Sequence, residues 1–304
     1  MKQLVTDAYN YASGWLGQGN AATFIPELTK ADPNRLGICI TTVDGQQYAI
    51  GNCEDKFTIQ SISKIFMLAA AIEDAGYEEV FSRIGYEDRG EEFNSIYKME
   101  IMDPHPSNPL LNAGAICTSS LIKGKTVEEK YGKLFDLAAK CMGVDKVESA
   151  NDVFNCEMTT GFRNRVLAQI MDDAGLLGSS QEDALIIYFR GCSMMVDCKM
   201  LSRFGAVLAG GGKDPITGEQ YFKPETARLL RTLMAGCGMY TKSGEYAVRV
   251  GLPSKSGSGG GICTAVPGKM GIGTFSPLLD ASGNSLCGVK AMEYLSDKAD
   301  LCIY

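Results

Sequence analysis

The sequence predicts a mixed α/β fold in which a helical middle region lies between two halves of one antiparallel sheet. Two observations predict this arrangement. Segments rich in β-forming residues occur near both ends of the 304-residue chain, and helical segments fill the region between them. Because no repeat or low-complexity linker separates these parts, we expect them to pack tightly and to leave a cleft between them for a site.

The first β-rich region is a predicted hairpin over residues 36–51. Two β-rich runs flank Asp44-Gly45, a dipeptide that suits the left-handed dihedral angles of a tight turn. The region after the hairpin is helical in character. Its helical segments each end in the glycine expected after a helix C-cap, and they read IFMLAAAIEDAG, VEEKYGKLFDLAAKCMG, RNRVLAQIMDDAG and CKMLSRFGAVLAGGG.

The second β-rich region consists of three predicted strands over 246–250, 261–266 and 271–275, separated by glycine-rich or proline-containing turns. A helix over 285–297 closes the pattern. These boundaries predict a sheet part made of residues 1–60 and 246–304 and a helical part made of residues 61–245. We expect the two parts to act as one functional domain over 1–304.

The composition points to a small-molecule partner. A formal net charge of -7 and a pI near 5.0 argue against nucleic-acid binding and against an anionic membrane surface. The first residues contain no apolar run of signal-peptide length, so we expect a cytoplasmic protein with reduced cysteines. Because His105 is the only histidine and no Cys-x-x-Cys pair occurs, we predict neither a metal nor a cofactor.

The single histidine also limits the catalytic chemistry. A Ser-His-Asp arrangement is available only if His105 is the base, and its Asp-Pro-His-Pro setting favours a loop role. A lysine can replace histidine when burial or a nearby positive charge makes its ammonium easier to deprotonate. The pattern Ser-x-x-Lys on a helix supplies suitable geometry, because residues at i and i+3 share a face.

This pattern occurs three times, at Ser61–Lys64, Ser95–Lys98 and Ser120–Lys123. Only the first copy opens a nearly apolar helix directly after an extended segment, which predicts a buried helix N-terminus with backbone donors nearby. The alternative is a helix-capping Ser61 with a solvated Lys64. Local sequence alone favours that alternative.

Longer blocks select the first copy. Lys255-Ser256-Gly257 precedes a glycine run and a strand, as in the penicilloyl serine transferases. The blocks FTIQSISKIF, NPLLNAGAI, Glu157 through Arg163-Asn164, YFRGCS, CGMY and VGLPSKSGSGGGI resemble, in order and spacing, the serine-dependent glutaminases. The resemblance extends from Ala21 to Gly288.

This resemblance implies a β-lactamase-like fold, with a five-stranded antiparallel sheet flanked by helices and a helical subdomain. It also implies hydrolysis of L-glutamine to L-glutamate and ammonia through a glutamyl-serine ester, and assembly as a homodimer or homotetramer. Carried over by position, Ser61 is the expected nucleophile, Lys64 its base, and Tyr240 the relay of a proton to the leaving ammonia. The backbone N–H groups of Ser61 and Ser258 are the expected oxyanion hole.

The resemblance further implies a pocket for the amino-acid end of the substrate. Its expected lining residues are Asn112, Glu157, Asn164, Tyr188 and Tyr240. A carboxylate such as Glu157 can pair with the substrate ammonium, whereas the amides and Tyr188 can hydrogen-bond the α-carboxylate. Glu157 and Asn164 would share a face if their segment is one helix. Taken singly, Asn112 also suits a helix start, Glu157 a surface charge and Tyr188 a core aromatic.

The chain departs from the usual family pattern at four places. Phe24 stands where tyrosine is usual, so a pocket hydroxyl is expected to be missing, and Ser258 stands where valine is usual. Residues 87–90 read Glu-Asp-Arg-Gly instead of Glu-Pro-Ser-Gly, and the loop around His105 is longer by Pro106 and Ser107.

These departures leave two alternatives open, which are an amidohydrolase acting on a related amide and a non-catalytic amino-acid sensor. A third alternative, a penicillin-interacting hydrolase, is suggested by Ser-x-x-Lys and Lys-Ser-Gly alone.

Overall fold

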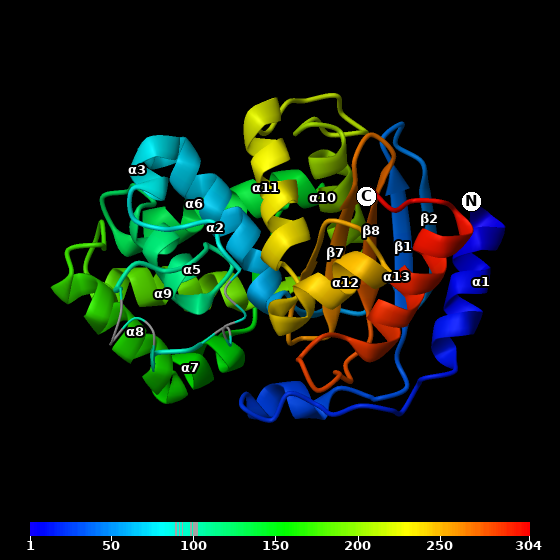
Figure 1. Cartoon of the computed structure of the whole chain (residues 1–304), viewed down its shortest axis with the longest axis horizontal. Coiled ribbons are helices and arrows are strands. Elements are labelled where there is room, and N and C mark those ends of the chain that lie inside the picture. Colours follow the sequence, from blue (N-terminus) through cyan, green and yellow to red (C-terminus); the bar gives the residue numbers. More distant parts are fainter. Residues whose placement is uncertain (89, 91, 93, 98, 100–102) are drawn as a thin grey trace.

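The computed structural model describes residues 1–88, 90, 92, 94–97, 99 and 103–304. Arg89 and Lys98, on which two of the sequence patterns rest, therefore lie outside the described residues. Figure 1 shows a group of helices on one side of the molecule and a sheet with its covering helices on the other.

The main sheet has five strands in the order β2-β1-β8-β7-β6, and every neighbouring pair is antiparallel. The predicted five-stranded antiparallel sheet flanked by helices is thus confirmed. The N-terminal hairpin supplies two of the strands and the C-terminal region the other three. In chain order they are β1 (Gly37–Thr42), β2 (Gln47–Gly51), β6 (Ser254–Ser256), β7 (Gly261–Val266) and β8 (Met270–Phe275).

The predicted hairpin and two of the three later strands are confirmed, and Gly45 in the hairpin turn has a φ of 88°. The prediction of a strand over 246–250 is wrong. This segment belongs to helix α12 (Ser243–Arg249), because its buried side chains, Tyr246 and Val250, are four residues apart, whereas Val248 is 88% exposed. A strand would have buried all three on one face.

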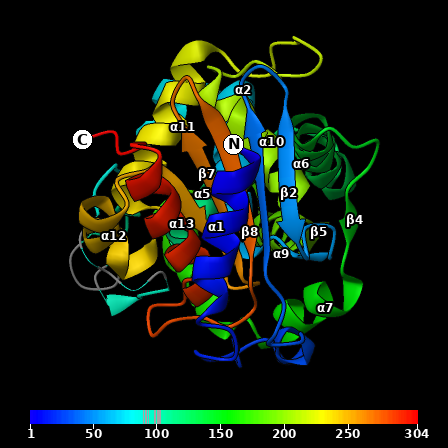
Figure 2. The ribbon, with the colours of Figure 1, turned by 90° about the vertical axis from the view of Figure 1, so that its right-hand side faces the viewer.

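Helices cover both faces of the sheet (Figure 2). Helices α1 (Lys2–Ser13) and α13 (Leu286–Lys298) lie on one face, and α10 (Cys198–Ala209) packs on the other. A Cβ atom on Gly271 of β8 would lie 2.0 Å from the backbone nitrogen of Ala206 in α10. Glycine at this strand position therefore allows α10 to lie directly on the sheet.

Several helices of the middle region pack against α2 (Lys64–Ala75), whose first eight residues are all buried. A second sheet of three strands has the order β3-β5-β4, and β3 leads directly into the segment before α2. The other elements are η1 (Pro26–Lys30), β3 (Phe57–Thr58), η2 (Gln60–Ser63), α3 (Tyr77–Phe81), α5 (Asn112–Ser120), α6 (Val127–Met142), β4 (Glu148–Ser149), α7 (Asn151–Thr160), α8 (Phe162–Asp173), α9 (Gln181–Cys192), β5 (Met194–Val196), α11 (Pro224–Cys237) and η3 (Tyr240–Lys242).

The cysteines are all free, and all but Cys156 and Cys302 are buried. Within the described part of the chain, each helix is too short or too polar to cross a bilayer.

Candidate active site

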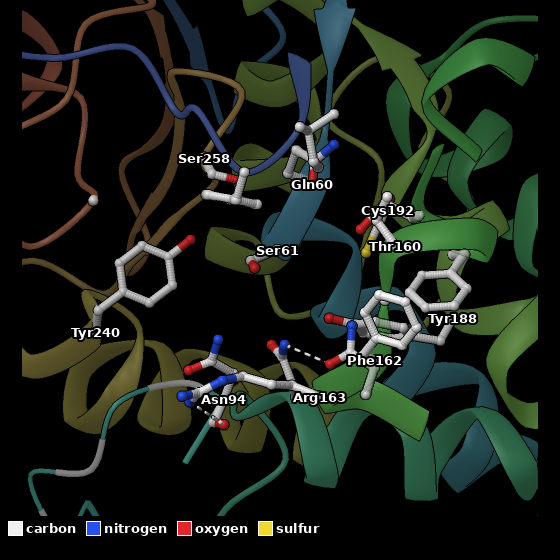
Figure 3. Close-up of a pocket in the computed structure, with 18 of the residues that line it drawn as sticks. Gln60, Ser61, Asn94, Thr160, Phe162, Arg163, Tyr188, Cys192, Tyr240 and Ser258 are labelled. Carbon is white, nitrogen blue, oxygen red and sulfur yellow. Dashed lines mark hydrogen bonds between the residues drawn. The ribbon is translucent and has the colours of Figure 1, made fainter. Parts of the chain in front are cut away.

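A cavity of about 370 Å³ is lined by residues of the helical group and of loops beside the main sheet. Its walls come from both ends of the chain and from the middle, as the close-up in Figure 3 shows. All predicted site residues line it except Lys64. The lining residues are Phe24, Ile25, Gln60, Ser61, Asn94, Asn112, Glu157, Thr160, Gly161, Phe162, Arg163, Asn164, Tyr188, Phe189, Cys192, Tyr240, Ser258, Leu279 and Gly283.

Ser61 lies in the short 3-10 turn η2, immediately before α2, and its hydroxyl faces the cavity. The preceding residue, Gln60, is buried and has a φ of 50°, a left-handed backbone conformation that residues other than glycine rarely adopt. Surrounding contacts hold it there: the Ser63 hydroxyl donates to its carbonyl at 2.7 Å, and its side-chain amide donates to Thr58 Oγ1 at 3.2 Å. The chain thus fixes the direction of the Ser61 side chain.

Lys64 is 0% exposed and lies one turn behind Ser61. Its ammonium donates to the carbonyl of Leu110 at 3.0 Å and to Oδ1 of Asn112 at 2.7 Å. Burial lowers the pKa of Lys64 from its usual 10.5 to about 8, although the negative charge of Glu157 opposes this change. The alternative of a solvated Lys64 is therefore wrong.

The Ser120–Lys123 copy has no comparable setting. The Ser120 hydroxyl donates to the carbonyl of Cys117 at 2.6 Å, and the Lys123 side chain is exposed. Neither residue borders the cavity.

A polar group of side chains forms the wall that belongs to the helical part. Asn112 Nδ2 donates to Asn164 Oδ1 at 2.9 Å, so the buried Lys64 ammonium, Asn112 and Asn164 form one hydrogen-bonded chain that ends at the cavity. Such a chain fixes the orientation of both amides. Asn112 is also the first residue of α5, so it begins a helix as well as lining the cavity.

Glu157 supplies a carboxylate to the same wall. Its Oε2 atom is closed off from solvent and makes no hydrogen bond within the described residues. Burial raises the pKa of Glu157 to about 8, and the charge of Lys64 works in the opposite direction. Glu157 and Asn164 do not lie on one helix, because Gly161 separates α7 from α8. Both side chains nevertheless line the cavity.

Two tyrosines complete the predicted set. Tyr188 in α9 is buried, and burial raises its pKa well above the usual value. Tyr240, at a φ of 53°, donates from its hydroxyl to the carbonyl of Ser256 at 3.2 Å. Burial also raises the pKa of Tyr240, and a hydrogen-bonding interaction with Ser61 opposes the rise. Its ring lies over the buried ammonium of Lys255, 4.4 Å from the ring centroid.

Sequence reasoning missed several lining residues as individual contributors. Gln60 and Arg163 adjoin predicted residues, and Cys192 lies one helical turn after Tyr188, so spacing alone could have identified them. By contrast, Leu279 and Gly283 come from a loop after β8 with no local signal. His105 lies in a loop away from the cavity, where its ring nitrogen lies 2.7 Å from Asp103 Oδ1.

Comparison with known proteins identifies the family. Residues 19–304 match the family model described as Glutaminase. The chain belongs to the glutaminase family. It is 44% identical over 305 residues to Glutaminase 2 of Clostridium perfringens, and the alignment covers 100% of both chains.

Solved glutaminase structures have the same fold. A probable glutaminase, ybaS, superposes with a TM-score of 0.95 at 36% identity and covers 100% of this chain and 97% of its own. The Bacillus subtilis glutaminase YbgJ, in its covalent complex with 5-oxo-L-norleucine, gives a TM-score of 0.91 at 32% identity over 100% of this chain and 99% of its own. That complex formed by reaction of YbgJ with 6-diazo-5-oxo-L-norleucine.

Proposed function

We propose that this glutaminase hydrolyses L-glutamine to L-glutamate and ammonia through a glutamyl ester on Ser61. The observation that carries the proposal is the cavity itself. In a member of the glutaminase family, it holds a serine and a carboxylate with one oxygen that has no partner within the described residues, and a buried lysine of lowered pKa lies one turn behind the serine. The covalent complex of YbgJ with 5-oxo-L-norleucine supports nucleophilic catalysis, because that reagent became bonded to the enzyme.

In this mechanism the neutral Lys64 amine accepts the proton of Ser61 as the hydroxyl attacks the amide carbon. A lysine pKa near 8 makes this possible close to neutral pH. The backbone N–H groups of Ser61 and Ser258 hold the developing oxyanion, and the Tyr240 hydroxyl passes a proton to the leaving ammonia. Departure of ammonia leaves the glutamyl-Ser61 ester, which water then hydrolyses.

The wall opposite Tyr240 binds the amino-acid end. Glu157 pairs with the substrate ammonium, which explains why one of its oxygens has no partner within the described residues. Asn112, Asn164 and Tyr188 hydrogen-bond the α-carboxylate. Phe24 is 56% exposed and borders the same cavity, so it adds an apolar surface to the wall.

The purified protein is tested with glutamine, asparagine and the labelling reagent 6-diazo-5-oxo-L-norleucine. We expect ammonia release from glutamine well above that from asparagine, whose amide is one methylene closer to the α-carbon. Mass spectrometry should find the mass of the reagent less dinitrogen on the peptide that carries Ser61. Absence of ammonia release, or a label on another residue, would contradict the proposal.

Replacing Glu157 by glutamine should weaken substrate binding, because an amide cannot pair with the ammonium as an anion. Loss of a partly buried ion pair costs about 2–4 kcal/mol, so kcat/KM for glutamine should fall roughly 30- to 1000-fold, mostly through KM. Steady-state kinetics on glutamine and on glutaramate, which lacks the α-amino group, measure this. The Glu157→Gln variant should lose far less on glutaramate, and an equal loss on both would argue against an ammonium contact.

A further inference from the structure

The loop between β6 and β7 lies against the segment that carries Ser61. A Cβ atom on Gly257 would lie 2.5 Å from the carbonyl oxygen of Ile59, and one on Gly259 would lie 2.2 Å from that of Thr58. Glycine at both positions is therefore required for the contact. Within the run Gly-Ser-Gly-Gly-Gly, only Ser258 carries a side chain, and that side chain stands at the cavity.

The Ser258 hydroxyl is available to a ligand. The residue is half-buried, and neither its hydroxyl nor its backbone N–H makes a hydrogen bond within the described part of the chain. Thr160 also brings a hydroxyl on a small side chain to the cavity, but that hydroxyl already donates to the carbonyl of Cys156 at 2.8 Å. A free hydroxyl can donate one hydrogen bond and accept two.

Figure 3 places this hydroxyl at the reacting end of the cavity. The side chains of Ser258, Tyr240 and Ser61 surround the same space from three separate elements, whereas Tyr188 lies on the far side of Ser61. The proposed amino-acid wall is on that far side. A group between Ser258 and Tyr240 therefore meets the substrate amide and not its α-carbon.

We propose that the Ser258 hydroxyl holds the water molecule that hydrolyses the glutamyl-Ser61 ester. This inference rests on the proposed function. The water oxygen bonds to the ester carbon and loses a proton to Lys64, and the bond from that carbon to Ser61 Oγ breaks. The serine oxygen regains a proton from Lys64, and glutamate leaves, so atoms and charges balance.

The geometry indicates that Ser258 assists hydrolysis of the ester and not its formation. During acylation the amide nitrogen occupies the space beside Tyr240, and the carbonyl oxygen takes the backbone N–H groups. Once ammonia has left, an incoming water needs partners of its own, typically two to four polar atoms. Ser258 Oγ and the Tyr240 hydroxyl supply them from two sides of the space.

The test is Ser258→Val, which keeps the backbone N–H and removes the hydroxyl. The rate constant for ester hydrolysis should fall about 10-fold, the effect of one lost hydrogen bond in a closed site. The fraction of glutamyl-enzyme after acid quench should rise accordingly, and kcat and KM should fall together with kcat/KM unchanged. Quench mass spectrometry and steady-state assays measure these quantities, and Ser258→Thr, which restores a hydroxyl, should recover wild-type behaviour.

Thr160→Val is the matched control, because it removes a cavity hydroxyl that is already bonded within its own helix. It should not raise the acyl-enzyme fraction. A Ser258→Val enzyme with unchanged acyl-enzyme, or with kcat/KM reduced as much as kcat, would overturn the role of Ser258. If wild type itself forms no glutamyl-enzyme and releases no ammonia, the proposed function is wrong instead.

Discussion

Ammonia release from glutamine should be lost in the Ser61→Ala variant. Without its hydroxyl the chain has no oxygen in this position to form the ester, and removing a covalent nucleophile lowers kcat by roughly 10⁴- to 10⁶-fold. The variant should still bind glutamine, since the side chains of the amino-acid wall are unchanged. Coupled ammonia assays measure the rate, and calorimetry measures the binding.

Ser95→Ala is the control for this experiment. Ser95 opens the second Ser-x-x-Lys copy but does not border the cavity, so its loss should leave ammonia release near the wild-type rate. A Ser61→Ala enzyme that retains more than about a hundredth of wild-type kcat would exclude an ester on Ser61 as the main route.

Replacement of Lys64 by methionine should produce the second-largest loss. The apolar side chain fits a fully buried position but cannot accept a proton, so kcat should fall by about 10²- to 10⁴-fold, as for loss of a general base. Lys64→Arg separates base catalysis from charge, because arginine keeps a positive charge and does not deprotonate in proteins. Both variants should show this loss of kcat if Lys64 acts as the base, whereas a Lys64→Arg enzyme with near wild-type kcat would show that only the charge matters.

The wild-type pH profile follows from the same lysine. Its pKa is lowered to about 8, so the neutral amine predominates above that pH and is lost as the pH falls through it. The pKa of Glu157 is raised to about 8, so its carboxylate is protonated over the same range. Protonation of Lys64 and protonation of Glu157 both lower activity, so kcat/KM should fall steeply below about pH 8 in wild type. The fall should be less steep in Glu157→Gln, where only Lys64 still titrates.

The sequence predicted the parts of the fold that depend on local periodicity. The run from Gly261 to Val266 is a strand with the predicted bounds, because β-forming residues and flanking glycines agree there. The segment at 246–250 contains β-forming residues as well. Its buried residues, however, have a helical spacing, which the structure reveals because Val248 is exposed to solvent. Packing against other elements makes this segment a helix, and that packing cannot be derived from its amino-acid composition.

The candidate site also depends on distant parts of the chain more than on local sequence. The local pattern at Ser61 was no better than its two other copies, and it was the order of distant blocks that selected it. Burial of Lys64 depends on the carbonyl of Leu110 and the amide of Asn112, which are far away along the chain. Residues such as Leu279 and Gly283 reach the cavity through loop geometry alone, so no spacing rule could predict them.

The pairing of β1 with β8 has a consequence for synthesis of the protein in the cell. Residues 37–42 find their partner only when residues 270–275 have emerged from the ribosome, roughly ten to fifty seconds later at ordinary elongation rates. During that interval the hairpin presents an open, apolar edge that can pair with other nascent chains. Tyr240 and Ser258 also emerge long after Ser61, so the nascent chain is expected to acquire catalytic competence only once both residues have left the ribosome.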